Sequence, residues 1–390
     1  MSAEPVRRVP RLAVLAWTVA VAVLVVLGIA VWRYLRTGSP SGTDTMAGMH
    51  DHSAADALTR AGTLPLHPLF GPHVGASPLF TVWHLDAVAL ALIVLVGAWY
   101  LTGVALVAVR SPGRRWPLRR TALFVSGLAV CAYATNGSIA VYDQVLFTAH
   151  MVGHLALVMV APALLVAGRP LTLTLAASAP PHRARIERVV QGRLVGLLSS
   201  PPVALASYTV VIVGSHLTGL MDTVMRNTWA GQVEHLVYVL VGCQFFALVI
   251  GDEPLRWRLA SPARWLLLAV AMAVDTFTGV VLLQGTHTVA MLRSPNLDVN
   301  ALSDTRTGGA IMWFGGDAIM AVVMIMLVIS WLRAADSRQG EDAGWLEQAR
   351  RATIAGNIGV TAEPDAGGFD DDDAARDSYN AWLARLDQNG

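Results

Sequence analysis

The sequence predicts an all-α integral membrane protein, a polytopic helical bundle with about eight transmembrane helices. Hydrophobic residues make up 54% of the chain and charged residues only 14%, which is typical of proteins with many spans and unusual for water-soluble domains. The apolar residues form long runs, and a helix needs about 20 such residues to cross roughly 30 Å of hydrocarbon. The 28 basic residues are all arginines and are concentrated in alternate loops, which sets the orientation of the bundle.

Eight runs are long and apolar enough to cross a bilayer. The first run is too long for the core of a signal peptide, and no convincing small-residue cleavage site follows it. We therefore expect it to be retained as a membrane anchor. The eight runs cover residues 12–34, 84–109, 119–141, 144–168, 201–221, 230–251, 263–287 and 310–334.

The arginine-rich loops are expected on the cytoplasmic side of the membrane. Residues 110–120 and 169–200 carry five arginines each and residues 252–264 carry three, whereas the intervening loops carry few. With eight spans, this pattern places both termini in the cytoplasm of a multi-pass plasma-membrane protein. A net charge of +1 gives no reason to expect a nucleic-acid partner, and membrane lipids are the expected surroundings.

The spans divide the chain into four parts. Residues 1–36 form the N-terminal membrane anchor, and residues 37–83 form an extracytoplasmic segment that contains histidine and methionine. Residues 84–334 form a seven-helix membrane domain, and residues 335–390 form a cytoplasmic tail. A short basic helix around Pro181–Gln191 is expected in the long inner loop.

The histidines gather on one side of the predicted membrane. Of eleven histidines, only His182 falls on the cytoplasmic side. Ionisable side chains within spans are costly and usually face the bundle interior or a wet cavity, so a functional cluster is expected at the extracytoplasmic face. The other ten are His50, His52, His67, His73, His84, His150, His154, His216, His235 and His287.

His150 and His154 form the sharpest pair, because a spacing of four residues puts both imidazoles on one face of the fourth span. They could share a metal ion, or each could bond to a neighbouring helix. His84, His216 and His235 are further candidate ligands on other spans. Four carboxylates could fix histidine tautomers or form a proton path: Asp86, Glu234, Asp275 and Asp317.

The outer segment contains a methionine- and histidine-rich stretch with Met46, Met49, His50 and His52. Soft thioether sulfur favours Cu(I), and imidazole binds either oxidation state of copper. A short segment of this kind suits capture and handover of copper, although a low-complexity linker would look the same. The two cysteines, Cys131 and Cys243, form no CxxC pair and so indicate no thiol metal site.

Several of these stretches resemble the CtaG-like family of cytochrome c oxidase assembly factors. The resemblance covers about residues 83–335, and the end of the tail, 379–386, is similar to that of actinobacterial members. The stretch from the histidine pair to Pro162 is the most specific part. The stretches are Trp83-His-Leu-Asp86, Phe147–Pro162, Leu164–Pro170, Val233-Glu-His235, Asp252-Glu-Pro254 and Gly308–Trp313.

The resemblance implies a role in maturing a haem–copper oxidase, by supplying or placing copper in its catalytic subunit. That subunit, and soluble copper chaperones, would then be the partners. The family pattern is matched by His84, His150, His154, His235 and, less closely, His216. Since the chain lacks the paired cysteines of the soluble chaperones, a copper site here would have to use histidine and methionine.

Two other functions stay open. Histidines on different spans could ligate haem in an electron carrier, or Asp275 and Asp317 could serve a transporter of copper or protons. The one-sided placement of the histidines disfavours the first function, and the lack of an evident inverted repeat disfavours the second. We expect no enzymatic activity, because the sequence shows no nucleophile elbow, cofactor-binding loop or acid–base dyad.

Overall fold

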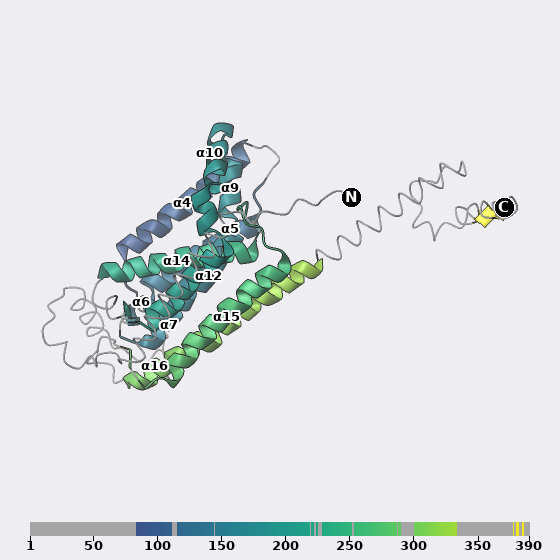
Figure 1. Ribbon diagram of the computed structural model, residues 1–390. Coiled ribbons are helices and arrows are strands. Elements are labelled where there is room, and N and C mark those ends of the chain that lie inside the picture. Colours follow the sequence, from purple (N-terminus) through teal and green to yellow (C-terminus); the bar gives the residue numbers. More distant parts are fainter. Residues whose placement is uncertain are drawn as a thin grey trace. The chain divides into compact units, whose positions relative to one another are not determined.

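The computed structural model describes residues 83–110, 115–143, 145–218, 228–251, 253–286 and 300–333, with isolated positions between and after them. Within these residues the regular elements are helices and no strand occurs, which confirms an all-α fold (Figure 1). The anchor, most of the outer segment and most of the tail lie outside the described residues. The same holds for four candidate ligands, Met46, Met49, His50 and His52, and for the histidines His67, His73 and His287.

Six helical stretches are long and apolar enough to cross a membrane within the described part of the chain, which confirms a multi-pass membrane protein. A further helical run, Pro201–Gly214, is apolar but shorter than these six stretches. The expected total of eight spans and the cytoplasmic location of the termini stay predictions. The six stretches are Ala87–Arg110, Leu118–Tyr142, Phe147–Ala177, Trp229–Ile250, Ser261–Gln284 and Ala301–Arg333.

The individual helices carry the labels of Figure 1. Three of the spans contain short breaks or π-helical turns, which are labelled η. In order, the elements are α4 (Ala87–Arg110), α5 (Leu118–Asn136), α6 (Ser138–Tyr142), α7 (Phe147–Leu155), η1 (Ala156–Val160), α8 (Ala161–Ala167), α9 (Pro170–Ala177), α10 (Pro180–Val190), α11 (Arg193–Leu198), α12 (Pro201–Thr209), η2 (Val210–Gly214), α14 (Thr228–Ile250), α15 (Ser261–Gln284), α16 (Ala301–Ala310) and η3 (Ile311–Gly315).

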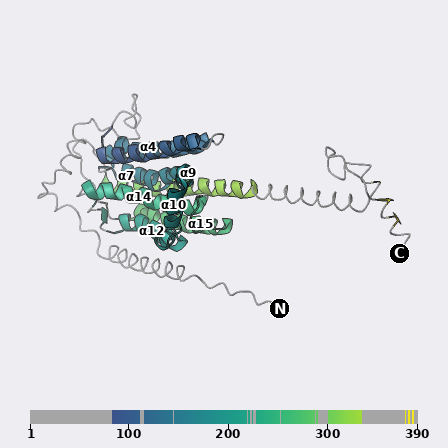
Figure 2. The same cartoon turned by 90° about the horizontal axis from the view of Figure 1, so that it is seen from above.

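The chain divides into two compact units, Met1–Met324 and Ile325–Gly390, and the bundle described below belongs to the first. The span from α7 to α9 is the most deeply buried of the six, and α4 is the most exposed. In Figures 1 and 2, α4 lies at one edge of the bundle, where it packs on α5 and α9. Its outward residues, such as Val94, Leu95 and Leu101, are apolar and exposed, as lipid-facing residues are.

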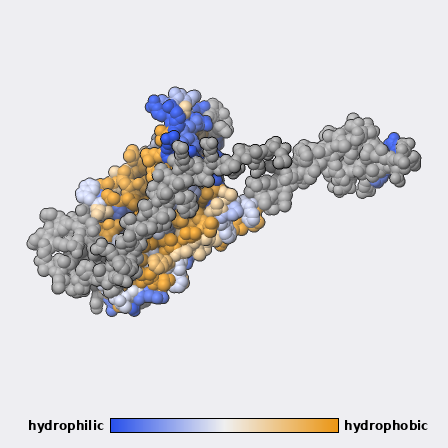
Figure 3. Space-filling view, viewed as in Figure 1, coloured by the Kyte–Doolittle hydropathy of each residue, from blue (hydrophilic) through white to orange (hydrophobic). Residues whose placement is uncertain are grey.

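The hydropathy of the surface agrees with a membrane-spanning bundle. Figure 3 shows hydrophobic residues over the flank of the helices and hydrophilic residues gathered over α10 at one end. Helix α10 is the short basic helix expected around Pro181–Gln191, and its side chains are mostly exposed. It is followed by a second short helix, α11, which the sequence did not indicate.

Two spans differ in length from their sequence-based bounds. The fourth was expected to end at residue 168 but continues through α9, after a break at Arg169, which adopts a left-handed backbone conformation with φ of 56°. Pro170 then begins α9, a position where a missing N–H costs nothing. The last span begins at Ala301 instead of 310, because the Asn300 side chain accepts a hydrogen bond from the Ser303 N–H at 3.0 Å and caps the helix.

Helix α9 is held at its start by Glu253, from the loop between α14 and α15. The Glu253 carboxylate accepts hydrogen bonds from the backbone N–H groups of Leu171 at 3.0 Å and Thr172 at 2.9 Å, and from the Thr172 hydroxyl at 2.7 Å. Burial raises the pKa of Glu253, and these hydrogen bonds oppose the shift. The contact joins one stretch of the family resemblance, 252–254, to the residues that directly follow another, 164–170.

Replacing Glu253 by glutamine is expected to lower the free energy of unfolding by about 1–3 kcal/mol, because one amide oxygen cannot serve donors on both sides and the NH2 group faces a donor. Thermal unfolding in detergent measures this change. Glu187→Gln is the matched control, since Glu187 pairs with Arg183 on the exposed α10, where ion pairs contribute little. Equal melting temperatures for the two variants would contradict a capping role for Glu253.

Candidate functional site

The sequence-predicted pair, His150 and His154, lies on α7 in the most buried span. Both side chains are buried, with 4% and 2% of their surface exposed. Leu146, at the N-cap of α7, supplies no capping side chain. Asp304 of α16 takes that role: its Oδ2 accepts from the Phe147 N–H at 2.7 Å, and its Oδ1 accepts from the Thr148 N–H at 3.2 Å and from the Thr148 hydroxyl.

His216 comes to the same place from the end of the run formed by α12 and η2. Its ring lies edge-on to His154, with 4.7 Å between ring centroids, and 6.0 Å from His150. Phe147 contacts both His150 and His216, and Tyr238 of α14 contacts His154 at 4.3 Å. His150, His154 and His216 are called the histidine cluster below.

Hydrogen bonding fixes the tautomer of His216. Its Nδ1 lies 2.8 Å from the carbonyl oxygen of Ile212, which can only accept, so Nδ1 carries the proton and donates. The Ser215 hydroxyl lies 2.7 Å from the same nitrogen, and Ser215 itself donates to the Val211 carbonyl. The Nε2 atom of His216 therefore presents a lone pair, which is the arrangement found in metal-ligating histidines.

Four buried ring nitrogens of the histidine cluster have no hydrogen-bond partner within the described residues. They are Nε2 of His150, both nitrogens of His154 and Nε2 of His216. Leaving a buried polar atom unpaired costs about 1–3 kcal/mol. Such a concentration of unpaired nitrogens at one place is the strongest indication of a binding site in the described bundle.

Two π-helical turns adjoin the histidine cluster. Segment η1 follows directly after α7, and η2 ends just before Ser215 and His216. Single π-helical turns inside α-helices are rare overall, and those that occur are often found at functional sites. The two turns therefore agree with a functional role for this region.

The remaining histidine candidates lie at the same end of the bundle, near its surface. His235 of α14 is half-buried, and its Nε2 is 3.9 Å from Oδ2 of Asp143. The His84 backbone N–H donates to the carbonyl of Asn136 at 2.8 Å, which anchors the start of α4 to α5. No ring contact between His235 and the histidine cluster is found in the described part of the chain.

The four candidate carboxylates have other partners. Asp86 caps α4 by accepting from the Val88 and Ala89 N–H groups, both at 3.0 Å. Glu234 is buried and accepts from the hydroxyl of Tyr238 at 2.5 Å, and the ring of Tyr238 contacts His154. Asp275 and Asp317 form a separate group on α15 and the last span, with the partners Tyr208 and Thr276.

Sequence reasoning missed Asp304 and Tyr238. The sequence-based bounds of the last span begin at residue 310 and so leave Asp304 outside it. One signal was present, since residues 144–146, Gln-Val-Leu, contain no good N-cap before α7, which implies a cap from elsewhere in the fold. The identity of that distant cap could not be found from the sequence alone.

The described ranges contain no set of three His, Cys, Asp or Glu side chains already gathered around a common point for a metal ion. In the histidine cluster the rings contact one another without a common ligand point, so binding an ion there requires the rings to reorient. The direct contact between His154 and His216 also leaves no room for a haem plane between these two rings.

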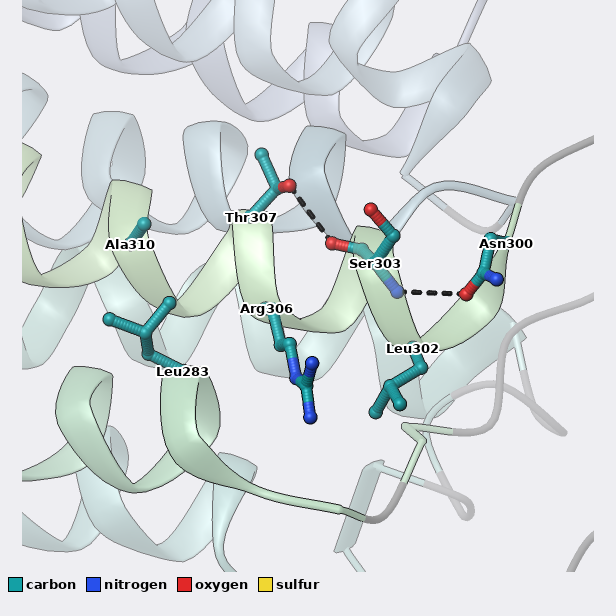
Figure 4. Close-up of a pocket in the computed structure, with 7 residues that line it drawn as sticks. All are labelled: Leu283, Asn300, Leu302, Ser303, Arg306, Thr307 and Ala310. Atoms are coloured by element: carbon teal, nitrogen blue, oxygen red, sulfur yellow. Dashed lines mark hydrogen bonds between the residues drawn. The ribbon is translucent and has the colours of Figure 1, made fainter.

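An open pocket on α16 is distinct from the histidine cluster. Its lining residues Ser303, Arg306 and Thr307 are exposed, and Figure 4 shows them together with Asn300 and Leu283, which also line it. They occupy a different face of α16 from Asp304, which contacts α7. The pocket has no buried group without a partner, so the histidine cluster is the stronger candidate site.

Comparison with known proteins places the chain among oxidase assembly factors. The family model described as "Cytochrome c oxidase caa3 assembly factor" matches residues 98–334, more than half of the chain and the whole histidine cluster. No solved structure matches.

Mycobacterial relatives share the same region. An uncharacterized protein of Mycobacterium leprae is 30% identical over 269 residues, 65% of this chain and 40% of the relative. Uncharacterized proteins of Mycobacterium bovis and Mycobacterium tuberculosis are each 29% identical over 266 residues, with the same coverage. The chain thus spans about two fifths of the length of these relatives. On the strength of the match over residues 98–334, the chain belongs to the cytochrome c oxidase caa3 assembly factor family.

Proposed function

We propose that the protein is an assembly factor that binds copper in transit to the catalytic subunit of a cytochrome c oxidase, with the histidine cluster as its binding site. The observation that carries this proposal is the set of buried ring nitrogens without partners. The metal is a cargo here, and the oxidase subunit is its destination. Soluble copper chaperones are the proposed donors.

The chemistry of the cluster favours a monovalent soft ion. The hydrogen bonds of His216 join it to Ser215 and Ile212, which are uncharged. The Glu234 carboxylate is separated from the histidine rings by Tyr238, whose hydroxyl it accepts from. Burying a cation among neutral ligands costs less for one charge than for two. Imidazole is a good ligand for copper, so Cu(I) fits this environment better than a divalent ion.

Transient binding also agrees with the geometry. Two of the three histidines share α7 and the third comes from a different helical run, so rotation of the rings can open or close a shared site without moving the backbone. The methionine- and histidine-rich stretch 46–52 is proposed to capture copper at the extracytoplasmic face and pass it to the cluster.

Anaerobic titration of the detergent-purified protein with Cu(I), against a competing chelator, tests the proposal. Wild type is expected to bind copper stoichiometrically, and the His150→Ala/His154→Ala double variant is expected to lose at least tenfold in affinity because two of three ligands are gone. His182→Ala removes an exposed imidazole on α10 and should leave binding unchanged. Deletion of residues 44–54 measures the contribution of the outer segment.

Each other outcome has a defined meaning. Binding lost only on deletion of 44–54 would make that segment the receiver and contradict a site at the histidine cluster. A Soret absorption band in protein from haem-replete cells would favour a haem carrier instead.

A deletion strain tests the role in assembly. Under copper limitation, the oxidase protein is expected to be present but deficient in copper. Normal oxidase activity and copper content in that strain would overturn the proposed role.

A further inference from the structure

A second buried group lies on α15, apart from the histidine cluster. Asp275 is fourteen residues from the start of α15 and nine from its end, or about 21 Å and 14 Å along the helix. Its side chain has 0% of its surface exposed. A carboxyl group at this depth in a span is costly and is usually functional.

The partners of Asp275 are few. Its Oδ2 accepts a hydrogen bond from the Tyr208 hydroxyl of α12 at 2.9 Å, while its Oδ1 is buried and has no partner among the described residues. Tyr208 is itself fully buried and stacks on Phe245 at 4.7 Å between ring centroids. The last span closes over the group, since a Cβ atom at Gly316 would lie 3.7 Å from the Cβ of Asp275.

Among the described residues, no basic side chain forms an ion pair with this carboxyl group. The ion pairs found within the described residues, Arg183–Glu187 and His235–Asp143, do not involve it. The titratable groups that interact with Asp275 are Tyr208 from α12 and Asp317 from the last span, and neither is basic. The adjoining turns η2 and η3 contain no ionisable residue.

An ionised carboxylate in this position would be a buried charge with one hydroxyl donor and a second carboxylate on the adjacent span. Transfer of an unpaired charge into an apolar interior costs far more than transfer of a neutral acid, and such groups neutralise instead. A hard metal cation would need about six or more oxygen ligands. Among the described residues, Tyr208 is the one whose side-chain oxygen bonds to Asp275. The Asp317 carboxylate accepts a hydrogen bond from the Thr276 hydroxyl at 3.1 Å.

We infer that Asp275 and Tyr208 form a proton-binding site within the bundle, in which Asp275 is a neutral carboxylic acid that carries its proton on the unpartnered Oδ1. Oδ2 is then the carbonyl oxygen that accepts from Tyr208. On ionisation the proton leaves Oδ1 for water and Tyr208 keeps donating to Oδ2. This site does not depend on copper binding by the histidine cluster, and it would take a proton in place of a metal ion.

Infrared spectroscopy of the full-length purified protein at neutral pH tests the inference directly. Wild type is expected to show a carboxylic-acid C=O stretch that shifts in D2O and is lost in Asp275→Asn, a variant with nearly the shape of the neutral acid. Asp317→Asn is the matched control, because it removes the neighbouring carboxyl and should leave this band in place. Tyr208→Phe removes the hydrogen bond to Oδ2, so it should move the band to higher frequency.

The Tyr208 variant keeps the test decisive if Asp275→Asn does not fold, because it shifts the band without removing the acid. Absence of a carboxylic-acid band from wild type would show an ionised Asp275 and overturn the inference. So would a band that is lost in Asp317→Asn, or one that does not move in Tyr208→Phe.

Discussion

Replacing Asp304 by alanine is expected to lower the free energy of unfolding by about 3 kcal/mol, because it leaves the Phe147 and Thr148 N–H groups without their acceptor. It also removes the shorter of the two hydrogen bonds that the Thr148 hydroxyl donates to Asp304. Each of these donors lies at the start of α7, where the helix has no internal partner for them. The positive end of the α7 dipole adds to the loss, since it favours a carboxylate at this position. Thermal or denaturant unfolding in detergent measures the effect.

The change at Asp304 should also reach the histidine cluster. The backbone N–H of Phe147 donates to Asp304, and the ring of Phe147 packs against the rings of both His150 and His216. If the first turn of α7 frays, the His150 and His216 rings lose their contact with Phe147. The affinity for Cu(I) should then fall together with stability. Thr148→Val, which removes only the hydroxyl, is expected to have a smaller effect on both properties.

Two variants serve as controls for Asp304→Ala. Asp304→Asn keeps one acceptor oxygen and should lie between wild type and alanine in stability. Arg306→Ala alters an exposed residue of the same helix and should have little effect. If Asp304→Ala unfolds at the same temperature as Arg306→Ala, then Asp304 does not cap α7.

The spans were predictable because their signal is local. Hydropathy depends on residues that follow one another, and each predicted span from 84 to 334 does contain a helix. The spacing of His150 and His154 is local in the same sense, so their common helix could be deduced. The ends were less predictable: the fourth span resumes as α9 after the left-handed break at Arg169, which no run of apolar residues indicates.

The contacts of the candidate site were not predictable, because they join residues far apart in the chain. The Asp304 carboxylate and the Phe147 N–H are separated by 157 positions. The hydrogen bond between Glu234 and Tyr238 is an exception, since these side chains lie one helical turn apart on α14. By contrast, nothing in the sequence around His216 indicates that it lies beside His150 and His154.

Close approach of backbones is a second feature without a clear sequence signal, and Gly242 of α14 is its sharpest case. A Cβ atom at Gly242 would lie 2.3 Å from the carbonyl oxygen of Val158 in η1 and 2.5 Å from the Pro162 ring. Neither group can rotate away, because one is backbone and the other is a ring closed on the backbone. Small residues at such crossings let membrane helices pack closely.

Gly242→Ala is therefore expected to destabilise the bundle by about 3 kcal/mol, the upper end of the cost of overpacking. The separation of α14 from η1 should also draw Tyr238 away from His154, whose ring it contacts at 4.3 Å. Thermal unfolding in detergent and Cu(I) affinity measure the two effects.

Gly231→Ala is the matched control, because it makes the same substitution on the same helix at a position with nothing within 4 Å. It should be neutral or stabilising by up to about 1 kcal/mol, since alanine favours a helix more than glycine does. The helix-propensity gain is common to both variants, so the difference between them isolates the cost of the backbone contact. Equal stability of the two variants would mean that α14 and η1 do not approach as closely as the structure shows.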